Sequence, residues 1–235
     1  MSHHYVIYED VRYVYPNGFE ALKGVSFHIT HGERVAILGR NGAGKSTLLL
    51  LSNGLLVPTS GKVNIGGIPV GKKTLTLVRQ AVGMVFQNPD DQLFMPTVEE
   101  DVAFGPINMG LPMEEVERRV TKALEQIGML EYRRKSPSQL SGGQKRRVAI
   151  STVLSMEPSI LVLDEPTSNL DFGARRELIE VLKGFSHTQI IVSHDLEMIK
   201  ELCPRVIVLD DGRVIADGPC SGILADPEIQ KALGL

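Results

Sequence analysis

The chain has 235 residues, of which 43% are hydrophobic and 23% charged, and its net charge is −3. This balance is typical of an ordinary globular protein, and it argues against nucleic-acid binding as the main role. The longest apolar stretch, residues 48–57, is interrupted by polar residues, whereas a bilayer span needs about 20 apolar residues. We therefore expect no membrane-spanning helix or cleavable signal, and a cytoplasmic chain.

The N-terminal part of the chain has the alternation of strands. Apolar and polar residues alternate over 5–15 and 21–27, and the turn signal Pro16–Gly18 lies between these two runs. The pair His3–His4 precedes them and is expected to be a disordered end rather than a metal site. This part predicts an antiparallel β region.

A glycine-rich loop follows a buried strand predicted over 34–38, and it fits the pattern G-x-x-x-x-G-K-[ST]. Its glycines let backbone N–H groups turn inward, and a helix predicted from Lys45 adds partial positive charge, so the loop can cradle a triphosphate. Lys45 is placed to reach the β- and γ-phosphates, and the Ser46 hydroxyl to bind Mg²⁺. The competing interpretation is a glycine-rich surface turn with an exposed lysine. The predicted nucleotide-binding residues of this phosphate loop are Gly39, Arg40, Asn41, Gly42, Ala43, Gly44, Lys45, Ser46 and Thr47.

The remaining elements alternate between strand and helix. The middle third reads as helical, because apolar residues recur at helical spacing from Val116 to Ile127. Other strands are expected over 61–67 (a hairpin), 82–86, 160–163, 190–193, 205–209 and from 214, and helices over 144–154, 172–182, 196–202 and in a tail from 221. This order predicts an α/β fold with a P-loop NTPase core, that is, a parallel sheet with flanking helices. We expect a single domain over 1–235, with a helical subdomain inserted over roughly residues 88–156.

Two carboxylates end the predicted strand 160–163. In a chain with a phosphate loop, Asp164 in this position holds Mg²⁺, and Glu165 can orient or deprotonate the water that attacks the γ-phosphate. Solvated charges at a strand end are the alternative.

A second glycine-rich segment, Ser141, Gly142, Gly143 and Gln144, starts the helix predicted over 144–154. From the residues alone, two interpretations are equally good. The free N–H groups could bind the triphosphate of another copy of the protein, or Ser141 could be an ordinary helix N-cap. The basic run Lys145–Arg147 that follows is expected to form a solvated helix face.

Together these segments resemble the ATP-binding subunits of ABC transporters. The resemblance rests on the phosphate loop, Gln87, Leu140–Gln144, Leu161–Pro166, Ser168–Asp171 and His194, in that order along nearly the whole chain. It implies an ATPase that uses ATP and Mg²⁺ and works as a head-to-tail dimer. Each ATP would lie between the phosphate loop of one copy and the Ser141–Gln144 segment of the other.

The same resemblance implies roles for single residues. Tyr15 would stack on adenine, with Tyr13 as the fallback and core packing as the alternative. Gln87 would sense Mg²⁺ and contact a membrane subunit, and His194 would contact the γ-phosphate; a plain surface glutamine and a structural histidine are the alternatives. Residues 168–171 would couple the two sites. The predicted catalytic residues are thus Glu165, His194 and Gln87, and the predicted Mg²⁺ ligands are Ser46, Gln87 and Asp164.

The run Phe86–Phe94, with residues 96–106, resembles the energy-coupling-factor importers, and most of all their cobalt and nickel ATPases. Leu93 and Phe94 lie beside acidic Asp90 and Asp91, a mix that could form a groove for a helix of an integral membrane transport subunit docking near Gln87–Phe94. Inward packing of Leu93 and Phe94 is equally open. The resemblance places the protein at the cytoplasmic face of the membrane.

Three alternatives differ in substrate or in class. The first is an energy-coupling-factor ATPase for biotin or another vitamin, although the short tail after residue 212 favours a metal or biotin importer with a homodimer. The second is a non-transport ABC ATPase of DNA repair or translation, although such proteins usually carry long coiled coils or a second domain. The third, a small-molecule kinase or GTPase, would leave Ser141–Gln144 and His194 without a purpose.

Overall fold

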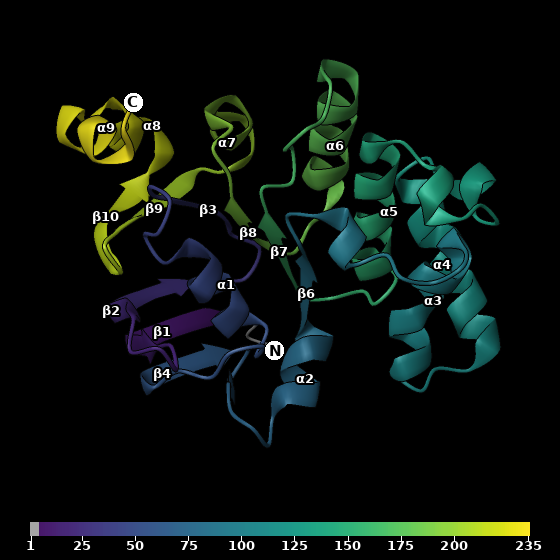
Figure 1. Ribbon diagram of the computed structural model, residues 1–235, viewed down its shortest axis with the longest axis horizontal. Coiled ribbons are helices and arrows are strands. Elements are labelled where there is room, and N and C mark those ends of the chain that lie inside the picture. Colours follow the sequence, from purple (N-terminus) through teal and green to yellow (C-terminus); the bar gives the residue numbers. More distant parts are fainter. Residues whose placement is uncertain (1–4) are drawn as a thin grey trace.

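The computed structural model describes residues 5–235, so the predicted disordered end at His3–His4 lies outside the described residues. A four-stranded antiparallel sheet, in the order β2-β1-β4-β5, lies beside a six-stranded sheet in the order β10-β9-β3-β8-β7-β6 (Figure 1). The smaller sheet contains β1 (Val6–Val14), β2 (Glu20–Ile29), β4 (Ser60–Ile65) and β5 (Ile68–Pro69). The larger contains β3 (Arg34–Leu38), β6 (Val82–Val85), β7 (Ile160–Asp164), β8 (Thr188–Val192), β9 (Arg205–Asp210) and β10 (Arg213–Pro219).

The larger sheet is parallel except for β10, which pairs antiparallel with β9. Its strands are buried on both faces, because Ile37 and Val162 belong to one apolar core while Leu38 and Leu163 belong to the other. Double burial explains why these strands read as continuous apolar runs instead of alternating. The α/β fold with a parallel core and an N-terminal antiparallel region is confirmed.

Helices cover both faces of the larger sheet. They are α1 (Lys45–Ser52), α2 (Leu75–Ala81), α3 (Val98–Asn108), α4 (Met113–Gln126), α5 (Gly142–Leu154), α6 (Phe172–Gly184), α7 (Leu196–Leu202), α8 (Cys220–Ala225) and α9 (Pro227–Leu233). Figure 1 shows α1 between the two sheets and α3, α4 and α5 gathered beyond the edge strand β6. None of the helices within residues 5–235 combines the length and the apolar character that crossing a membrane requires.

The sequence patterns do not predict α2, whereas α3 lies in the middle third, which is expected to be helical, without bounds of its own. α2 has seven residues and buries only Val78, so its apolar pattern is too short to mark a helix. α3 contains Pro106, which disfavours a helix, although Thr97 and Glu100 form a capping box at its start. Residues 89–154 form three helices, three 3-10 turns and no strand. The boundaries of the helical subdomain stay a prediction.

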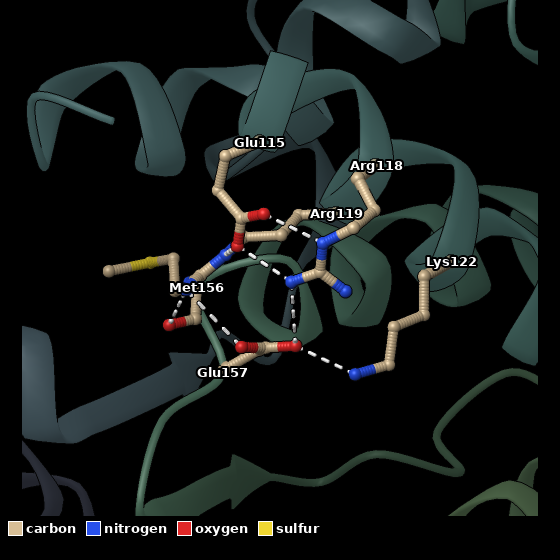
Figure 2. A network of polar contacts seen from close by, with 6 residues as sticks. All are labelled: Glu115, Arg118, Arg119, Lys122, Met156 and Glu157. Atoms are coloured by element: carbon tan, nitrogen blue, oxygen red, sulfur yellow. Dashed lines mark hydrogen bonds and ion pairs between the residues drawn. The ribbon is translucent and has the colours of Figure 1, made fainter. Parts of the chain in front are cut away.

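A network of exposed charges fastens α4 to the connection between α5 and β7 (Figure 2). Glu115 accepts hydrogen bonds from Arg118 and Arg119, which lower the pKa of its carboxyl to about 2. Arg119 and Lys122 in turn contact Glu157 at 3.3 and 2.7 Å. Each exposed pair contributes little stability by itself, but the set fixes how α4 lies on this connection.

Candidate nucleotide-binding site

The phosphate loop connects β3 to α1, and its glycines have backbone conformations that other residues adopt only with strain. Gly39 has φ 154° and Gly44 has φ 102°. A Cβ atom would lie 2.3 Å from the Leu209 carbonyl oxygen at Gly39 and 2.7 Å from the Ala21 carbonyl oxygen at Gly44. The loop can therefore take this path only with glycine at these positions.

The start of α1 has the features of an anion site. Its N-cap residue, Gly44, makes no side-chain capping hydrogen bond, so the first N–H groups of the helix are not used by a cap. The Lys45 ammonium lies over the loop, donating to the carbonyl oxygens of Gly39 at 2.6 Å and Arg40 at 3.1 Å. Burial lowers the pKa of Lys45, and the charges of Glu165 and Asp164 oppose that shift.

The phosphate loop opens onto a pocket of about 560 Å³. The pocket brings together residues predicted from widely separated segments of the chain: Tyr15, Asn41, Gly42, Gly44, Lys45, Ser46, Thr47, Gln87, Asp164, Glu165, Ser168 and His194. Gly39, Arg40 and Ala43 do not line it; Arg40 is exposed and Ala43 is buried. The volume and the cationic loop suit a nucleoside triphosphate.

Glu165, which follows β7, is held by hydrogen bonds to the end of the neighbouring strand β8 and to the two residues after it. Its backbone N–H donates to the Val192 carbonyl at 2.8 Å, and its Oε2 accepts hydrogen bonds from the His194 N–H at 3.1 Å and the Ser193 hydroxyl at 3.3 Å. The other oxygen, Oε1, is buried without a hydrogen-bond partner and lies 3.5 Å from His194 Nε2. One carboxylate oxygen is thus fixed while the second remains to orient a water molecule.

The residues predicted to bind Mg²⁺ fit that ion. Ser46, Gln87 and Asp164 line the same pocket and offer hydroxyl, amide and carboxylate oxygens, the ligands that Mg²⁺ prefers. Burial and the neighbouring Glu165 raise the pKa of Asp164, while Lys45 and Arg146 lower it. Residues 5–235 contain no group of three or more His, Cys, Asp or Glu arranged for a metal. The set therefore suits an ion that shares its coordination with phosphate and water oxygens.

Two aromatic residues form one wall of the pocket. The Tyr15 hydroxyl lies 3.0 Å from Thr47 Oγ1, whereas Tyr13 packs against the apolar core and does not line the pocket. Phe19, which the sequence analysis missed, also lines the pocket, and its ring stacks near Tyr15 with the centroids 6.5 Å apart. The tight turn between them holds both rings, since Tyr15 N–H donates to the Phe19 carbonyl at 2.9 Å. A flat aromatic ligand suits this wall.

The Ser141–Gln144 segment forms a complete capping box at the start of α5. The Ser141 N–H donates to Gln144 Oε1 at 2.9 Å, and the Gln144 N–H donates to Ser141 Oγ at 3.3 Å. The N-cap interpretation is therefore correct, yet the cap leaves the N–H groups of Gly142 and Gly143 unused. No residue of the segment lines the pocket of its own chain, and Ser141 and Gly142 are exposed.

The prediction of a solvated face for Lys145–Arg147 was wrong for Arg146. This side chain is buried, with 2% of its surface exposed, and it donates to the carbonyl oxygens of Phe86, at 2.7 Å, and of Gln87. Lys145 and Arg147 are half-buried and form ion pairs with Asp90 and Glu177. The error has a physical cause, because residues 86–92 pack across the first turns of α5, a tertiary contact that helix periodicity cannot reveal.

Of the two alternatives for Leu93 and Phe94, inward packing applies to Leu93 and exposure in a groove applies to Phe94. Leu93 is buried, and Phe94 is 62% exposed with its ring edge-on to Phe104 at 4.9 Å. Both aromatic rings line a groove of about 240 Å³, here called the docking groove, together with Met84, Asp101 and Met156. Asp101 Oδ1 accepts from the N–H groups of Phe94 and Met95, and its Oδ2 has no hydrogen-bond partner. Asp90 and Asp91 do not line this groove, so its acidic group is Asp101 and not the pair expected from the sequence.

Comparison with known proteins shows similarity to a family model, to a curated relative and to solved structures. Residues 22–168 match the family model described as ABC transporter. The energy-coupling factor transporter ATP-binding protein EcfA of Methanothermobacter thermautotrophicus is 50% identical over 96% of this chain and 74% of its own length.

Two solved structures are also similar. One is cbiO1 of Clostridium perfringens, described as part of the ABC transporter complex cbiONQ, with 41% identity, a TM-score of 0.86 and coverage of 97% of this chain and 94% of its own. The other is the ATP-binding cassette MJ0796, described as a dimer in a post-hydrolysis state with ADP and Pi, with 32% identity, a TM-score of 0.82 and coverage of 92% of this chain and 98% of its own.

Proposed function

The chain belongs to the ABC transporter family, as an ATP-binding ATPase domain, and we propose that it is the motor subunit of an energy-coupling-factor importer for cobalt or nickel ions. The observation that carries the proposal is the division of the site. Lys45, Asp164 and Glu165 share one pocket, while no residue of the Ser141–Gln144 segment lines it and Ser141 and Gly142 are exposed. A complete site then needs a second copy of the chain.

Within one copy, the phosphate loop binds the triphosphate and Lys45 leaves its loop carbonyls for the phosphate oxygens. Ser46, Gln87 and Asp164 would hold Mg²⁺, which when bound would neutralise charge on the β- and γ-phosphates. Glu165 orients the attacking water through its unpaired Oε1, and His194, 3.5 Å away, is close enough to contact the same γ-phosphate. Tyr15 and Phe19 receive the adenine.

The Ser141–Gln144 segment of the second copy closes the site. Its N–H groups at Gly142 and Gly143, together with the α5 N-terminus, are donors for the γ-phosphate of the partner's ATP. In this arrangement each ATP contacts both copies and thereby holds the dimer together. Hydrolysis and release of products then reopen the dimer. The dimeric relative bound to ADP and Pi supports this proposal.

The docking groove is the proposed contact for an integral membrane transport subunit. Its exposed aromatic pair, Phe94 and Phe104, suits the apolar face of a helix, and it lies next to the loop that contains Gln87. Closure of the dimer would pull the membrane subunit through this contact, with the chain at the cytoplasmic face of the membrane. Cobalt or nickel as the cargo rests on the resemblance of Phe86–Phe94 and residues 96–106 to the cobalt and nickel ATPases; biotin or another vitamin is the alternative cargo.

The test of the motor assignment is the Glu165→Gln variant, which keeps the shape of the side chain but removes the base. We expect its ATP hydrolysis to fall by about 100-fold or more, and ATP to convert the 25.8 kDa chain into a stable dimer in light scattering. Glu177→Gln, an exposed residue paired with Arg147, is the matched control and should behave as the wild type. Hydrolysis by Glu165→Gln at the wild-type rate would show that Glu165 is not the base.

The test of the importer assignment is the identity of the proteins that copurify with the full chain from detergent-solubilised membranes. The proposal predicts integral membrane proteins, and cells lacking the chain should lose uptake of radiolabelled cobalt or nickel. Copurification of ribosomes or DNA instead would contradict the importer assignment. Loss of biotin uptake with normal metal uptake would identify biotin, and not a metal ion, as the cargo.

A further inference from the structure

Arg146 connects two parts of the molecule that act in different sites of the proposed dimer. It lies in the second turn of α5, just after the Ser141–Gln144 segment. Its guanidinium donates to the backbone carbonyls of Phe86, at 2.7 Å, and of Gln87. Gln87 lines the pocket of the same chain, whereas the Ser141–Gln144 segment does not.

The surroundings of Arg146 are unusual for a cation. The side chain is 2% exposed, and among residues 5–235 no carboxylate lies within ion-pair distance of it. Burying a charge without a paired carboxylate is costly, so the two carbonyl bonds, helped by the more distant charges of Asp164 and Glu165, must compensate. The planar guanidinium fork can donate to two adjacent carbonyls at once, which a lysine ammonium cannot do with the same geometry. The site therefore selects arginine for its shape.

Other residues fasten the same loop to the same helix. Gln92 accepts from the Phe86 N–H at 3.2 Å, and its amide donates to the Ala149 carbonyl and the Thr152 hydroxyl, both at 2.7 Å. Lys145 pairs with Asp90 at 2.6 Å. Residues 86–92, here called the Gln87 loop, are thus joined to one side of α5 along three turns. A displacement of the α5 N-terminus must carry the loop with it.

We propose that Arg146 is a positioning residue that makes the placement of Gln87 in one pocket depend on the ATP that the partner copy presents to the Ser141–Gln144 segment. The inference rests on the proposed dimer. When the segment binds the partner's γ-phosphate, α5 shifts, Arg146 moves the Gln87 backbone, and the Gln87 side chain reaches Mg²⁺ and the water in its own pocket. The two ATP sites are then coupled through a protein contact as well as through the shared interface.

The experiment compares Arg146→Met, which removes both donors at similar length, with Arg147→Met, the matched control on the neighbouring half-buried arginine, which pairs with Glu177. Each change is made in the wild type and in a Gln87→Ala background. We expect Arg146→Met to lower kcat about tenfold in the wild type and less than about twofold in the Gln87→Ala background, because effects that act through one residue are not additive. Arg147→Met should change neither, and in each background the arginine substitutions should leave ATP affinity of the monomer at the value of that background.

Arg146→Lys is the second variant, since it keeps the charge and most of the volume if Arg146→Met does not fold. It can reach one carbonyl but not hold both, so it should fold with a somewhat lower unfolding temperature and retain the monomer's ATP affinity while kcat falls. An equal fall of kcat in both backgrounds, or wild-type kcat in Arg146→Lys, would overturn the proposal. A wild-type chain that neither hydrolyses ATP nor dimerises with it would instead overturn the proposed function, so the two failures are distinguishable.

Discussion

The phosphate loop and the Ser141–Gln144 segment both place glycines at the N-terminus of a helix, but they are built for different situations. The phosphate loop is packed into the fold, and its Gly39 and Gly44 lie close to the backbone of Leu209 in β9 and of Ala21 in β2. The N-terminus of α1 has no side-chain cap, and the residues that line the pocket in front of it all belong to the same chain. The Ser141–Gln144 segment is exposed, and its helix end is already capped by Ser141 and Gln144.

This difference explains which site needs a partner. A buried, uncapped helix end is stable only if the surrounding fold supports the loop, and it then presents unused N–H groups to a ligand of its own chain. The exposed N-terminus of α5 is capped by its own side chains and needs no ligand for stability. The ligand for its glycine N–H groups is therefore expected to be one that another copy of the chain holds. Substitutions in the two regions should therefore differ in their effects on binding, hydrolysis and stability.

The largest effect is expected from Lys45→Ala. It removes the ammonium that is placed to bind the β- and γ-phosphates, so hydrolysis should fall by about 100- to 1,000-fold and ATP affinity of the monomer should fall with it. Steady-state hydrolysis and equilibrium binding of a fluorescent ATP analogue measure both. Lys122→Ala, in the exposed network of Figure 2, is the control. Unchanged ATP affinity in Lys45→Ala would contradict the assignment of the pocket.

Ser141→Arg is expected to separate the two functions. The large side chain blocks approach of a partner's phosphate, so hydrolysis and ATP-dependent dimerisation should fall by about 100-fold, while ATP affinity of the monomer stays within about twofold. The exposed Ser138 offers a control, since Ser138→Arg lies outside the segment and should have neither effect. Loss of monomer binding in Ser141→Arg would mean that the segment belongs to the pocket of its own chain.

Alanine in place of glycine tests the structural half of the comparison. Gly44→Ala combines a left-handed backbone with a Cβ 2.7 Å from a carbonyl oxygen, so it should lower the free energy of unfolding by about 1–3 kcal/mol. At Gly142 nothing lies within 4 Å of the added Cβ, and alanine favours a helix, so stability should change by less than about 1 kcal/mol. Urea denaturation of both variants measures the difference, and equal losses would contradict it.

The smallest effects are expected at the aromatic wall. Tyr15→Ala should weaken ATP binding by about tenfold, since base stacking contributes about 1–3 kcal/mol, and Phe19→Ala should weaken it by about threefold because its ring is more exposed. Tyr13→Phe is the control, as Tyr13 faces the core. Binding of the fluorescent analogue, in competition with ATP, measures all three. A larger effect at Tyr13 than at Tyr15 would mean that Tyr13, and not Tyr15, stacks on adenine.

The sequence predicted what local pattern and spacing determine. The strands β3 and β7, the phosphate loop and the carboxylates after β7 follow from apolar runs with glycines and charges at their ends, and the fold brings them to one pocket. Three features depend on contacts that only the folded chain makes. Arg146 is buried because the Gln87 loop covers α5, Phe19 reaches the pocket because of a tight turn, and Asp101 becomes the acidic group of the docking groove because it binds the N–H groups of Phe94 and Met95.

The most direct test of a site shared between two copies is to mix two inactive variants. In a mixed dimer of Lys45→Ala and Ser141→Arg, one site contains both defects, while the other combines an intact phosphate loop with an intact Ser141–Gln144 segment. We predict that an equal mixture hydrolyses ATP well above the rate of either variant alone. A mixture that gives only the mean of the two separate rates at every ratio would contradict the shared site.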